Sequence, residues 1–301
     1  MTAPRILFVF LDGVGIGPPD PSLNPFLCAR LPRLRALLGG ALPTLDRPLV
    51  SGERGVAFAL DASLDVPGTP QSGTGQTTLL TGENAARAFG RHFGPWTPVS
   101  LRPLLEDRSL LIRSLEAGHA TVFANAYPRS WPGHASLRRV AAPPLAARAA
   151  GLLTRHEEAL AEGAALASEI DNEGWRHHLG HTGLPEITPY RAGANLARLA
   201  GSARLTLFAH YATDHAGHRG GMEGGVAALE KVDAFLGGVL DALEDDALLL
   251  IASDHGNLED VSGGHTRNPA LGVLAGAGAH ARADALRSLL DVTPAVLSWL
   301  G

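Results

Sequence analysis

The chain has 301 residues, 45% of them hydrophobic, so it can form one large α/β domain or two small ones around a sizeable buried core. Its formal net charge of -5, without a basic run, argues against nucleic acid as a partner. No apolar stretch is long enough to span a membrane, and the early apolar run is too short for a signal peptide. The single cysteine, Cys28, excludes an intrachain disulfide framework and is expected to be a small buried residue in a cytoplasmic protein.

The first predicted element is a buried strand over residues 6–11, a near-continuous apolar run that ends at Asp12. Residues 67–86 form a Gly-flanked turn that leads into a helix rich in hydroxyl side chains. A second, weaker strand is predicted over residues 120–126. Residues 129–188 have a different pattern, in which a stretch with Pro and Trp precedes an Ala-rich helical one, and we interpret them as a small helical insertion or cap.

Helices and strands alternate in the C-terminal part of the chain. A helix is predicted over residues 189–201, where apolar residues recur with helical spacing, and a buried strand over residues 205–211. A long amphipathic helix over residues 224–246 leads into the last predicted strand, residues 248–252.

This alternation predicts the fold class. It favours a three-layer αβα sandwich in which helices cover both faces of a mostly parallel central sheet. Residues 1–128 and 189–301 would form this α/β core, and residues 129–188 would form the small helical insertion.

Acids follow three of the predicted strands. Asp12 follows the first strand, Asp214 follows the third, and Asp254 with His255 follows the last. In open parallel sheets, ligands bind outside the carboxyl ends of the strands. These side chains are therefore expected to converge at one edge of the sheet.

Two histidines extend this group. His218 lies four residues after Asp214, on the same face if that stretch is helical, and His265 returns through the Gly-rich sequence "VSGGH". Carboxylates combined with neutral imidazoles suit Zn²⁺ or Mn²⁺ better than Mg²⁺ or Ca²⁺. We predict two divalent metal ions, a pair suited to phosphoryl transfer. One ligand set is Asp12, Asp254 and His255, and the other is Asp214, His218 and His265, with His215 as a competing candidate.

A phosphoryl-transfer site also needs a nucleophile, and the segment 67–86 supplies hydroxyls. The helix is expected to begin near Gly73 or Thr74, where free backbone N–H groups and the positive end of the helix favour bound phosphate. A hydroxyl bound to a metal there would ionise more easily. The candidates are Ser72, Thr74, Thr77 and Thr78, and the alternative is that these residues only cap the helix.

Together these pieces resemble the alkaline phosphatase superfamily, and most closely its metalloenzyme branch, which holds cofactor-independent phosphoglycerate mutase and phosphopentomutase. The matching segments stand in the family's order and cover roughly residues 1–100 and 190–301. They are "FVFLDGVGIG", "SGTGQTTLLTG", "TDHAGH", "SDHGNLED" and "GGHTRNP". The resemblance implies an alkaline-phosphatase-like fold and a two-metal site.

The resemblance also implies roles for single residues. It selects Ser72 as the nucleophile, with Thr74 second, because the family spacing counted from Gly75 and from Gly82 leads to the same serine. It assigns Asp12, Ser72, Asp254 and His255 to one metal, and Asp214, His218 and His265 to the other.

The chain departs from the family pattern in three places. Gly75-Gln76 stands where Gly-His is usual, the insertion is short, and no lysine precedes Asp214, since Lys231 is the only lysine. An arginine would have to supply the missing positive charge, although not the same geometry. The candidates for binding a substrate phosphate are Arg87, Arg129, Arg191 and Arg267.

The leading prediction is a two-metal enzyme that transfers a phosphoryl group from a small phosphorylated molecule through a phosphoserine. A phosphatase or phosphodiesterase is favoured over a phosphomutase, because a mutase has to keep its intermediate from water under a substantial lid. A non-catalytic metal-binding regulatory protein is the alternative, and the filled ligand set argues against it. Sulfatase chemistry is disfavoured because Thr74 and Gln76 replace the Pro and Arg of C/S-x-P-x-R. The pattern does not indicate an oligomeric state.

Overall fold

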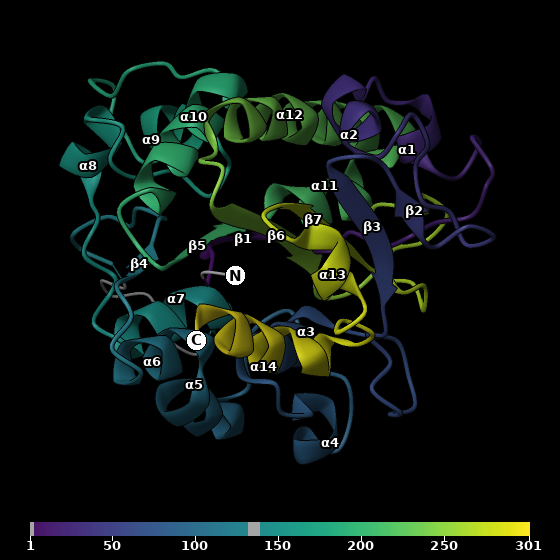
Figure 1. Ribbon diagram of the computed structural model, residues 1–301, viewed down its shortest axis with the longest axis horizontal. Coiled ribbons are helices and arrows are strands. Elements are labelled where there is room, and N and C mark those ends of the chain that lie inside the picture. Colours follow the sequence, from purple (N-terminus) through teal and green to yellow (C-terminus); the bar gives the residue numbers. More distant parts are fainter. Residues whose placement is uncertain (1–2, 132–138) are drawn as a thin grey trace.

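The structure, a computed structural model, describes residues 3–131 and 139–301. Within them, seven strands form one sheet at the centre of the molecule, in the order β2-β3-β7-β6-β1-β5-β4 (Figure 1). The strands are β1 (Arg5–Leu11), β2 (Val50–Ser51), β3 (Gly55–Leu60), β4 (Thr121–Phe123), β5 (Leu205–His210), β6 (Ala247–Ser253) and β7 (Ala270–Gly276). Residues 132–138 of the predicted insertion lie outside the described part of the chain.

The sheet is mixed but mostly parallel. Strands β6, β1, β5 and β4 are neighbours and pair in parallel. Strand β7 pairs antiparallel with both β6 and β3, and β2 pairs antiparallel with β3. In the described sheet, β7 and β2 therefore run against the other strands. The predicted strands are confirmed as β1, β4, β5 and β6, whereas β2, β3 and β7 are not among the predicted ones.

The central strand β1 has a core on each side. Phe8 and Phe10 point into one buried cluster, and Leu7, Val9 and Leu11 point into another. A strand buried on both faces needs apolar residues at consecutive positions rather than at alternate ones. This explains why the strand appears in the sequence as a continuous apolar run.

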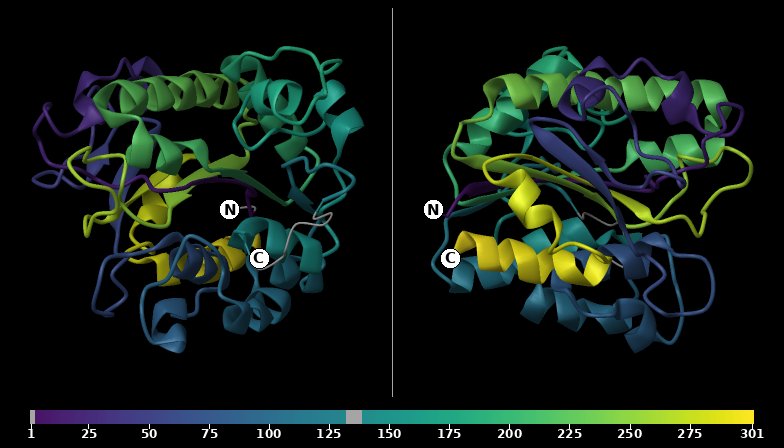
Figure 2. Two further views of the ribbon diagram at one scale, coloured as in Figure 1. Left: turned by 180° about the vertical axis from the view of Figure 1, so that it is seen from behind. Right: turned by 45° about the vertical axis from the view of Figure 1, so that its right-hand side comes forward.

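Helices cover both faces of the sheet, which confirms the predicted three layers (Figures 1 and 2). One layer contains α1 (Pro25–Cys28), α2 (Pro32–Leu37), α10 (Pro189–Ala200), α11 (Ala212–Arg219) and α12 (Gly221–Ala242). The other contains α3 (Ser72–Thr81), α4 (Ala85–Phe89), α5 (Arg102–Arg108), α6 (Leu110–Glu116), α7 (Ala142–Ala149), α13 (Ala279–Ala283) and α14 (Leu289–Leu300), with a short 3-10 helix, η1 (Val99–Leu101), before α5.

The segment predicted as an insertion occupies two places. Helix α7 packs against α3, α5 and α6 within their layer. The residues after α7, with the short helices α8 (Glu157–Ala161) and α9 (Glu173–His177), lie near the β4 edge of the sheet (Figure 1). They surround a small buried cluster that includes Trp175. The division into a core and a cap stays a prediction.

One prediction about a single residue is wrong. Cys28 is exposed rather than buried, and its thiol donates to the carbonyl of Pro21 at 3.2 Å. It is the last residue of α1, a four-residue helix that buries Pro25 and Phe26 instead. None of the helices in the described ranges has the length and apolar character needed to cross a membrane.

Candidate metal centre

The register of the three central strands brings the predicted ligands together. Leu11 of β1 pairs with His210 of β5 on one side and with Ser253 of β6 on the other. The segments that follow these strands therefore start at the same edge of the sheet. Asp12 begins the first of these segments and Asp254 begins another, so the two carboxylates become neighbours. The Asp254 carboxylate also accepts the N–H of Gly13 at 3.1 Å, although 241 positions separate these two residues.

The first group is Asp12, Asp254 and His255, whose possible ligand atoms all lie within 4.8 Å of one another. All three side chains are buried. His255 Nε2 lies 3.4 Å from Asp12 Oδ1 and 3.6 Å from Asp254 Oδ2. Burial raises the pKa of Asp12 and of Asp254, and repulsion between neighbouring carboxylates raises both further.

Two oxygens of this group have no hydrogen-bond partner among the described residues. They are Asp12 Oδ1 and Asp254 Oδ2, and both are inaccessible to solvent. Unpaired buried carboxylates are costly unless a cation neutralises them. Two carboxylates and an imidazole that point at one volume are also a typical donor set for Zn²⁺ or Mn²⁺. The residues present therefore fit a divalent ion.

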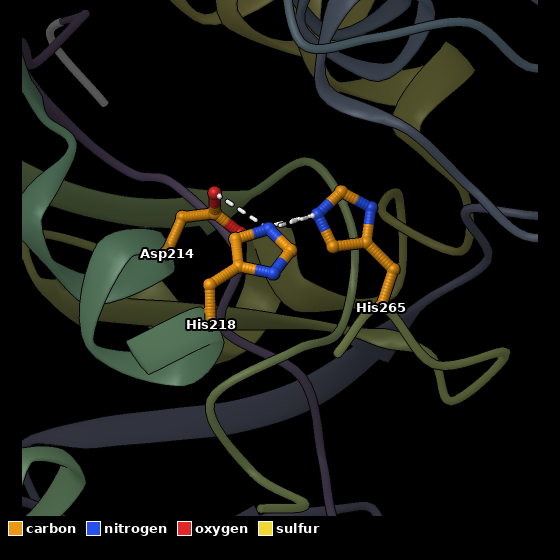
Figure 3. Close-up of side chains that lie close together, drawn as sticks. All are labelled: Asp214, His218 and His265. Atoms are coloured by element: carbon orange, nitrogen blue, oxygen red, sulfur yellow. Dashed lines mark hydrogen bonds and ion pairs between the residues drawn. The ribbon is translucent and has the colours of Figure 1, made fainter. Parts of the chain in front are cut away.

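The second group is Asp214, His218 and His265 (Figure 3). Asp214 and His218 are one turn apart on α11, and His218 Nε2 lies 3.3 Å from the aspartate and 2.9 Å from His265 Nε2. Two imidazole nitrogens that face each other at this distance cannot both carry a proton, and a shared cation suits them. Burial raises the pKa of Asp214, but His265 and His255 lower it to about 2, so this carboxylate is ionised.

Backbone carbonyls hold two of the histidines in the tautomer that a metal ligand needs. His265 Nδ1 lies 3.1 Å from the carbonyl of Pro70, and His255 Nδ1 lies 3.2 Å from that of Gly256. We assign a proton to each Nδ1, because only an N–H can donate to a carbonyl. Each Nε2 then presents a lone pair to the site, in the manner of metal-ligating histidines. The rings of His255 and His265 stack at 4.0 Å, so the two groups adjoin.

Ser72 is the candidate hydroxyl that faces this site. It is the first residue of α3, is only 2% exposed, and its Oγ lies 2.9 Å from His255 Nε2. The hydroxyls of the other three candidates donate to backbone carbonyls instead. Thr74 Oγ1 donates to a carbonyl, at 3.3 Å from that of Gln71 and 3.4 Å from that of Phe93, while Thr77 and Thr78 donate to carbonyls one turn earlier.

The start of α3 differs from the expectation of free N–H groups. Thr74 N–H donates to the carbonyl of Phe93 at 2.9 Å, whereas the bond from Gly75 N–H to the carbonyl of Gln71, at 2.8 Å, is the first regular bond of the helix. The neighbouring loop therefore takes part of the donor set that phosphate would use. What α3 contributes most clearly is the position of Ser72.

Three polar residues support the predicted ligands, and none of them is among the predicted site residues. Gln76 donates to Asp12 Oδ2 at 3.0 Å and accepts the N–H of Ala142 at 3.2 Å. Asn257 donates to Asp214 Oδ1 at 2.7 Å. Gln76 lies inside the motif "SGTGQTTLLTG" and Asn257 inside "SDHGNLED". Their place within these motifs is the sequence feature that could have identified them as site residues.

Glu259 is the third supporting residue, and it is fully buried. Its Oε2 accepts the N–H groups of Gly15 at 2.9 Å and Asn257 at 2.7 Å. Its Oε1 accepts from Thr266 Oγ1 at 2.6 Å and Asn268 Nδ2 at 3.0 Å. One carboxylate thus connects the loops that carry the predicted ligands Asp12, His255 and His265.

A cavity of about 770 Å³ opens beside Ser72. Its described lining includes Asp12, Gln76, Asp214 and His218, together with His215, which belongs to neither ligand group. It also includes two arginines, Arg139 and Arg219, and none of the four predicted ones. The predicted arginines, Arg87, Arg129, Arg191 and Arg267, are exposed, and Arg129 pairs with Glu158.

Comparison with known proteins gives a match in the C-terminal part of the chain. A model of the metalloenzyme superfamily matches residues 194–301. The 2,3-bisphosphoglycerate-independent phosphoglycerate mutase of Cereibacter sphaeroides (strain ATCC 17025 / ATH 2.4.3) is 32% identical over 127 residues, which cover 39% of this chain and 25% of that enzyme. The 2,3-bisphosphoglycerate-independent phosphoglycerate mutase 2 of Methanosarcina acetivorans is 31% identical over 128 residues, which cover 39% and 24%. The chain thus spans about a quarter of the length of these curated relatives.

Solved structures extend the likeness to the whole fold. The PH0037 protein from Pyrococcus horikoshii superposes with a TM-score of 0.59 at 14% identity, over 100% of this chain and 98% of that one, which shows a shared fold. An alkaline phosphatase from the Antarctic bacterium TAB5 gives a TM-score of 0.47 at 11% identity over 99% of both chains, which supports no inference. The match to the metalloenzyme superfamily covers residues 194–301, the part that contributes five of the seven predicted ligands.

Proposed function

We propose that this protein is a metal-dependent phosphoryl-transfer enzyme that acts on a small phosphorylated molecule, with Ser72 as its nucleophile. The observation that carries the proposal is the position of Ser72 Oγ, 2.9 Å from His255 Nε2 and beside both groups of possible ligands. The relatives named as phosphoglycerate mutases support the same class of chemistry.

Two divalent ions would be held by residues of this chain. Asp12, Asp254 and His255, with Ser72, would bind one, and Asp214, His218 and His265 would bind the other. The mixed oxygen and nitrogen donors favour Mn²⁺ or Zn²⁺ over Mg²⁺. When bound, such ions lower the pKa of a coordinated hydroxyl and neutralise charge on the phosphoryl oxygens.

The protein residues around Ser72 would orient the reaction. The Oγ atom would attack phosphorus, and the ester oxygen would leave with a proton as an alcohol. The stacked rings of His255 and His265 and the hydrogen bond from Gln76 to Asp12 fix the side chains on either side of the attacking atom. Such positioning lowers the activation free energy, because the reacting atoms need no further ordering.

We infer hydrolysis of the phosphoserine rather than return of the phosphoryl group to the substrate. The cavity beside Ser72 is large, and α7 packs into the helix layer with α3, α5 and α6 instead of standing apart as a lid. Water can then reach the intermediate, as a phosphatase or phosphodiesterase requires. The named relatives favour the second candidate, a phosphomutase, in which another hydroxyl of the substrate accepts the phosphoryl group.

The test is intact mass after brief incubation with a panel of phosphoesters and Mn²⁺. The wild-type protein and a Thr74→Val control should gain one phosphoryl group, and Ser72→Ala should gain none. Release of inorganic phosphate would identify a hydrolase, and an isomerised substrate a mutase. An adduct retained in Ser72→Ala would overturn the assignment of the nucleophile. Bound metal without adduct or product would favour a non-catalytic metal-binding protein.

A further inference from the structure

The cavity beside Ser72 has one aromatic wall. Four of the seven Trp and Tyr residues of the chain line it, although only 5% of all residues are Phe, Trp or Tyr. The residues of the aromatic wall are Trp96, Tyr127, Trp131 and Tyr211. They come from three separate segments, before η1, after β4 and at the start of α11. Such a concentration at one cavity needs an explanation beyond core packing.

The aromatic wall is held in place from behind. The ring centroids of Tyr127 and Trp131 are 4.8 Å apart, and Tyr127 stacks on the buried Phe123 at 6.3 Å. Tyr211 meets the edge of buried Phe10 at 6.1 Å. Rings held by such contacts while they line a cavity form a preorganised binding surface, because little side-chain entropy remains to be lost.

Trp96 is the most accessible part of the wall. It is 40% exposed and lines the cavity. An exposed indole here costs free energy in the absence of a ligand, and a planar ligand would cover it. The observation therefore points to an occupant rather than to a structural role.

The wall and the reacting centre share one cavity. Its lining also contains Ser72 and Asp12, so a phosphoester whose phosphorus lies at Ser72 would direct its organic group towards the rings. The volume of about 770 Å³ lies within the range of roughly 300–1,000 Å³ that is typical for larger organic ligands. A three-carbon phosphate would leave most of the wall uncovered.

We propose that the phosphoester cleaved at Ser72 carries a planar aromatic group, and that the aromatic wall binds this group. The inference rests on the proposed function. In the reaction, the bond from Ser72 Oγ to phosphorus forms as the bond from phosphorus to the ester oxygen breaks, and the aromatic alcohol leaves with a proton. Water then cleaves the phosphoserine, which yields inorganic phosphate and regenerates Ser72.

The test compares two phosphate monoesters that differ in their ring. Benzyl phosphate and cyclohexylmethyl phosphate are both esters of primary alcohols with the same number of carbons, but only benzyl is planar and aromatic. With the Mn²⁺-loaded protein, we expect kcat/KM for benzyl phosphate to be about tenfold higher, the order that aromatic stacking contributes. Equal values for the two esters would overturn the inference and leave the proposed function intact.

Variants of the aromatic wall test whether it causes the preference for benzyl phosphate. Trp131→Leu should reduce it to about twofold or less, Trp131→Phe should keep most of it, and Trp96→Leu offers a second position if Trp131→Leu does not fold. Tyr190→Leu is the matched control, because Tyr190 is an exposed aromatic residue of α10 outside this cavity. A preference unchanged in all these variants would remove the wall as its cause.

A binding measurement separates the two proposals. If the wild type turns over no phosphoester, the proposed function fails, and calorimetry with benzylphosphonate and cyclohexylmethylphosphonate then tests the wall alone. Tighter binding of the benzyl compound, lost in Trp131→Leu or Trp96→Leu, would support an aromatic ligand site. Equal binding of both phosphonates, or no binding of either, would overturn it.

Discussion

At the scale of single residues, the buried Glu259 explains why the loops around the site contain small residues. A Cβ atom on Gly15 would lie 2.5 Å from Glu259 Cδ, and one on Gly256 would lie 2.3 Å from Thr266 Oγ1. Only glycine permits the backbone to approach the carboxylate so closely. Gly15 and Gly256 thus allow the hydrogen bonds of Glu259 rather than serve flexibility.

Glu259→Gln should therefore damage both stability and metal binding. Either orientation of the amide places an NH₂ group opposite two donors, so we expect the free energy of unfolding to fall by about 2–3 kcal/mol. Displaced ligands should weaken Mn²⁺ binding by at least about tenfold. Urea unfolding and calorimetry measure the two effects. The control is Asp260→Asn, since Asp260 accepts a local N–H from Ser262, and equal losses in both variants would refute this account.

The buried His210 predicts how stability depends on pH. Burial lowers its pKa to about 4, although its Nδ1 lies 2.7 Å from the carbonyl of Ser168. Between about pH 6.5 and about pH 4 the unfolded chain binds a proton that the folded protein does not, so stability falls as the pH falls through this window. The shift corresponds to about 3 kcal/mol in full.

His210→Asn should remove this part of the pH dependence. The comparison is the free energy of urea unfolding near pH 7.5 and near pH 4.5, with metal removed by a chelator so that ligand titration contributes alike to both proteins. The control, His178→Asn, changes an exposed histidine and should behave as wild type. Parallel losses of stability in wild type and His210→Asn would show that other groups cause the acid sensitivity.

At the scale of elements, glycines set the distance between α10 and α12. A Cβ atom on Gly238 would lie 1.8 Å from the carbonyl oxygen of Tyr190, and one on Gly193 would lie 2.0 Å from that of Phe235. The two helices can approach this closely only because neither position has a side chain. Helix α12 follows directly after α11, so the contact also supports the helix that carries Asp214 and His218.

Gly238→Ala should thus destabilise the protein even though alanine is the better helix former. The clash involves backbone atoms of α10, so we expect a loss of about 1–3 kcal/mol or more in the free energy of unfolding. Gly224→Ala in the same helix is the matched comparison, because its Cβ atom would meet no atom within 4 Å. That change should stabilise by roughly 0.5–1 kcal/mol. Equal effects in urea unfolding would argue against close helix contact.

At the scale of the whole molecule, the metal ions are expected to link folding to pH. Burial raises the pKa of Asp12 and of Asp254 in the metal-free protein, and repulsion from neighbouring carboxylates raises both further. Above about pH 4 the metal-free folded state therefore holds protons that the unfolded chain has lost, and its stability falls as the pH rises. Bound metal neutralises the ionised carboxylates and removes this penalty.

The stabilisation by metal should therefore grow with pH. We expect the difference in unfolding temperature between Mn²⁺-loaded and chelator-treated protein to increase from about pH 5.5 to about pH 8, because ligand binding to the folded state adds to its stability. Scanning calorimetry at constant metal concentration measures it. Asp12→Asn should flatten the trend, and a difference that does not change with pH would contradict a carboxylate metal centre.

The local pattern of the sequence already determines much of the central sheet. Strands β1, β5 and β6 are buried on both faces, so each appears as a near-continuous apolar run followed or ended by a polar residue. The chain direction of parallel strands then predicts that Asp12, Asp214 and Asp254 meet at one edge. The spacing of Asp214 and His218 places them on one face only if the stretch is helical, and α11 provides that helix.

Only the tertiary structure decided the remainder. Strands β2, β3 and β7 pair antiparallel. Strand β2 has only two residues, and β3 and β7 are rich in Ala and Gly, which favour strands weakly. The contact of the Ser72 hydroxyl with His255, the carboxylate network of Glu259 and the aromatic wall all depend on contacts between segments far apart in sequence. The periodicity of apolar residues along one segment indicates which of its faces are buried. It cannot report which distant side chain a hydroxyl faces, because that depends on how the layers pack around the sheet.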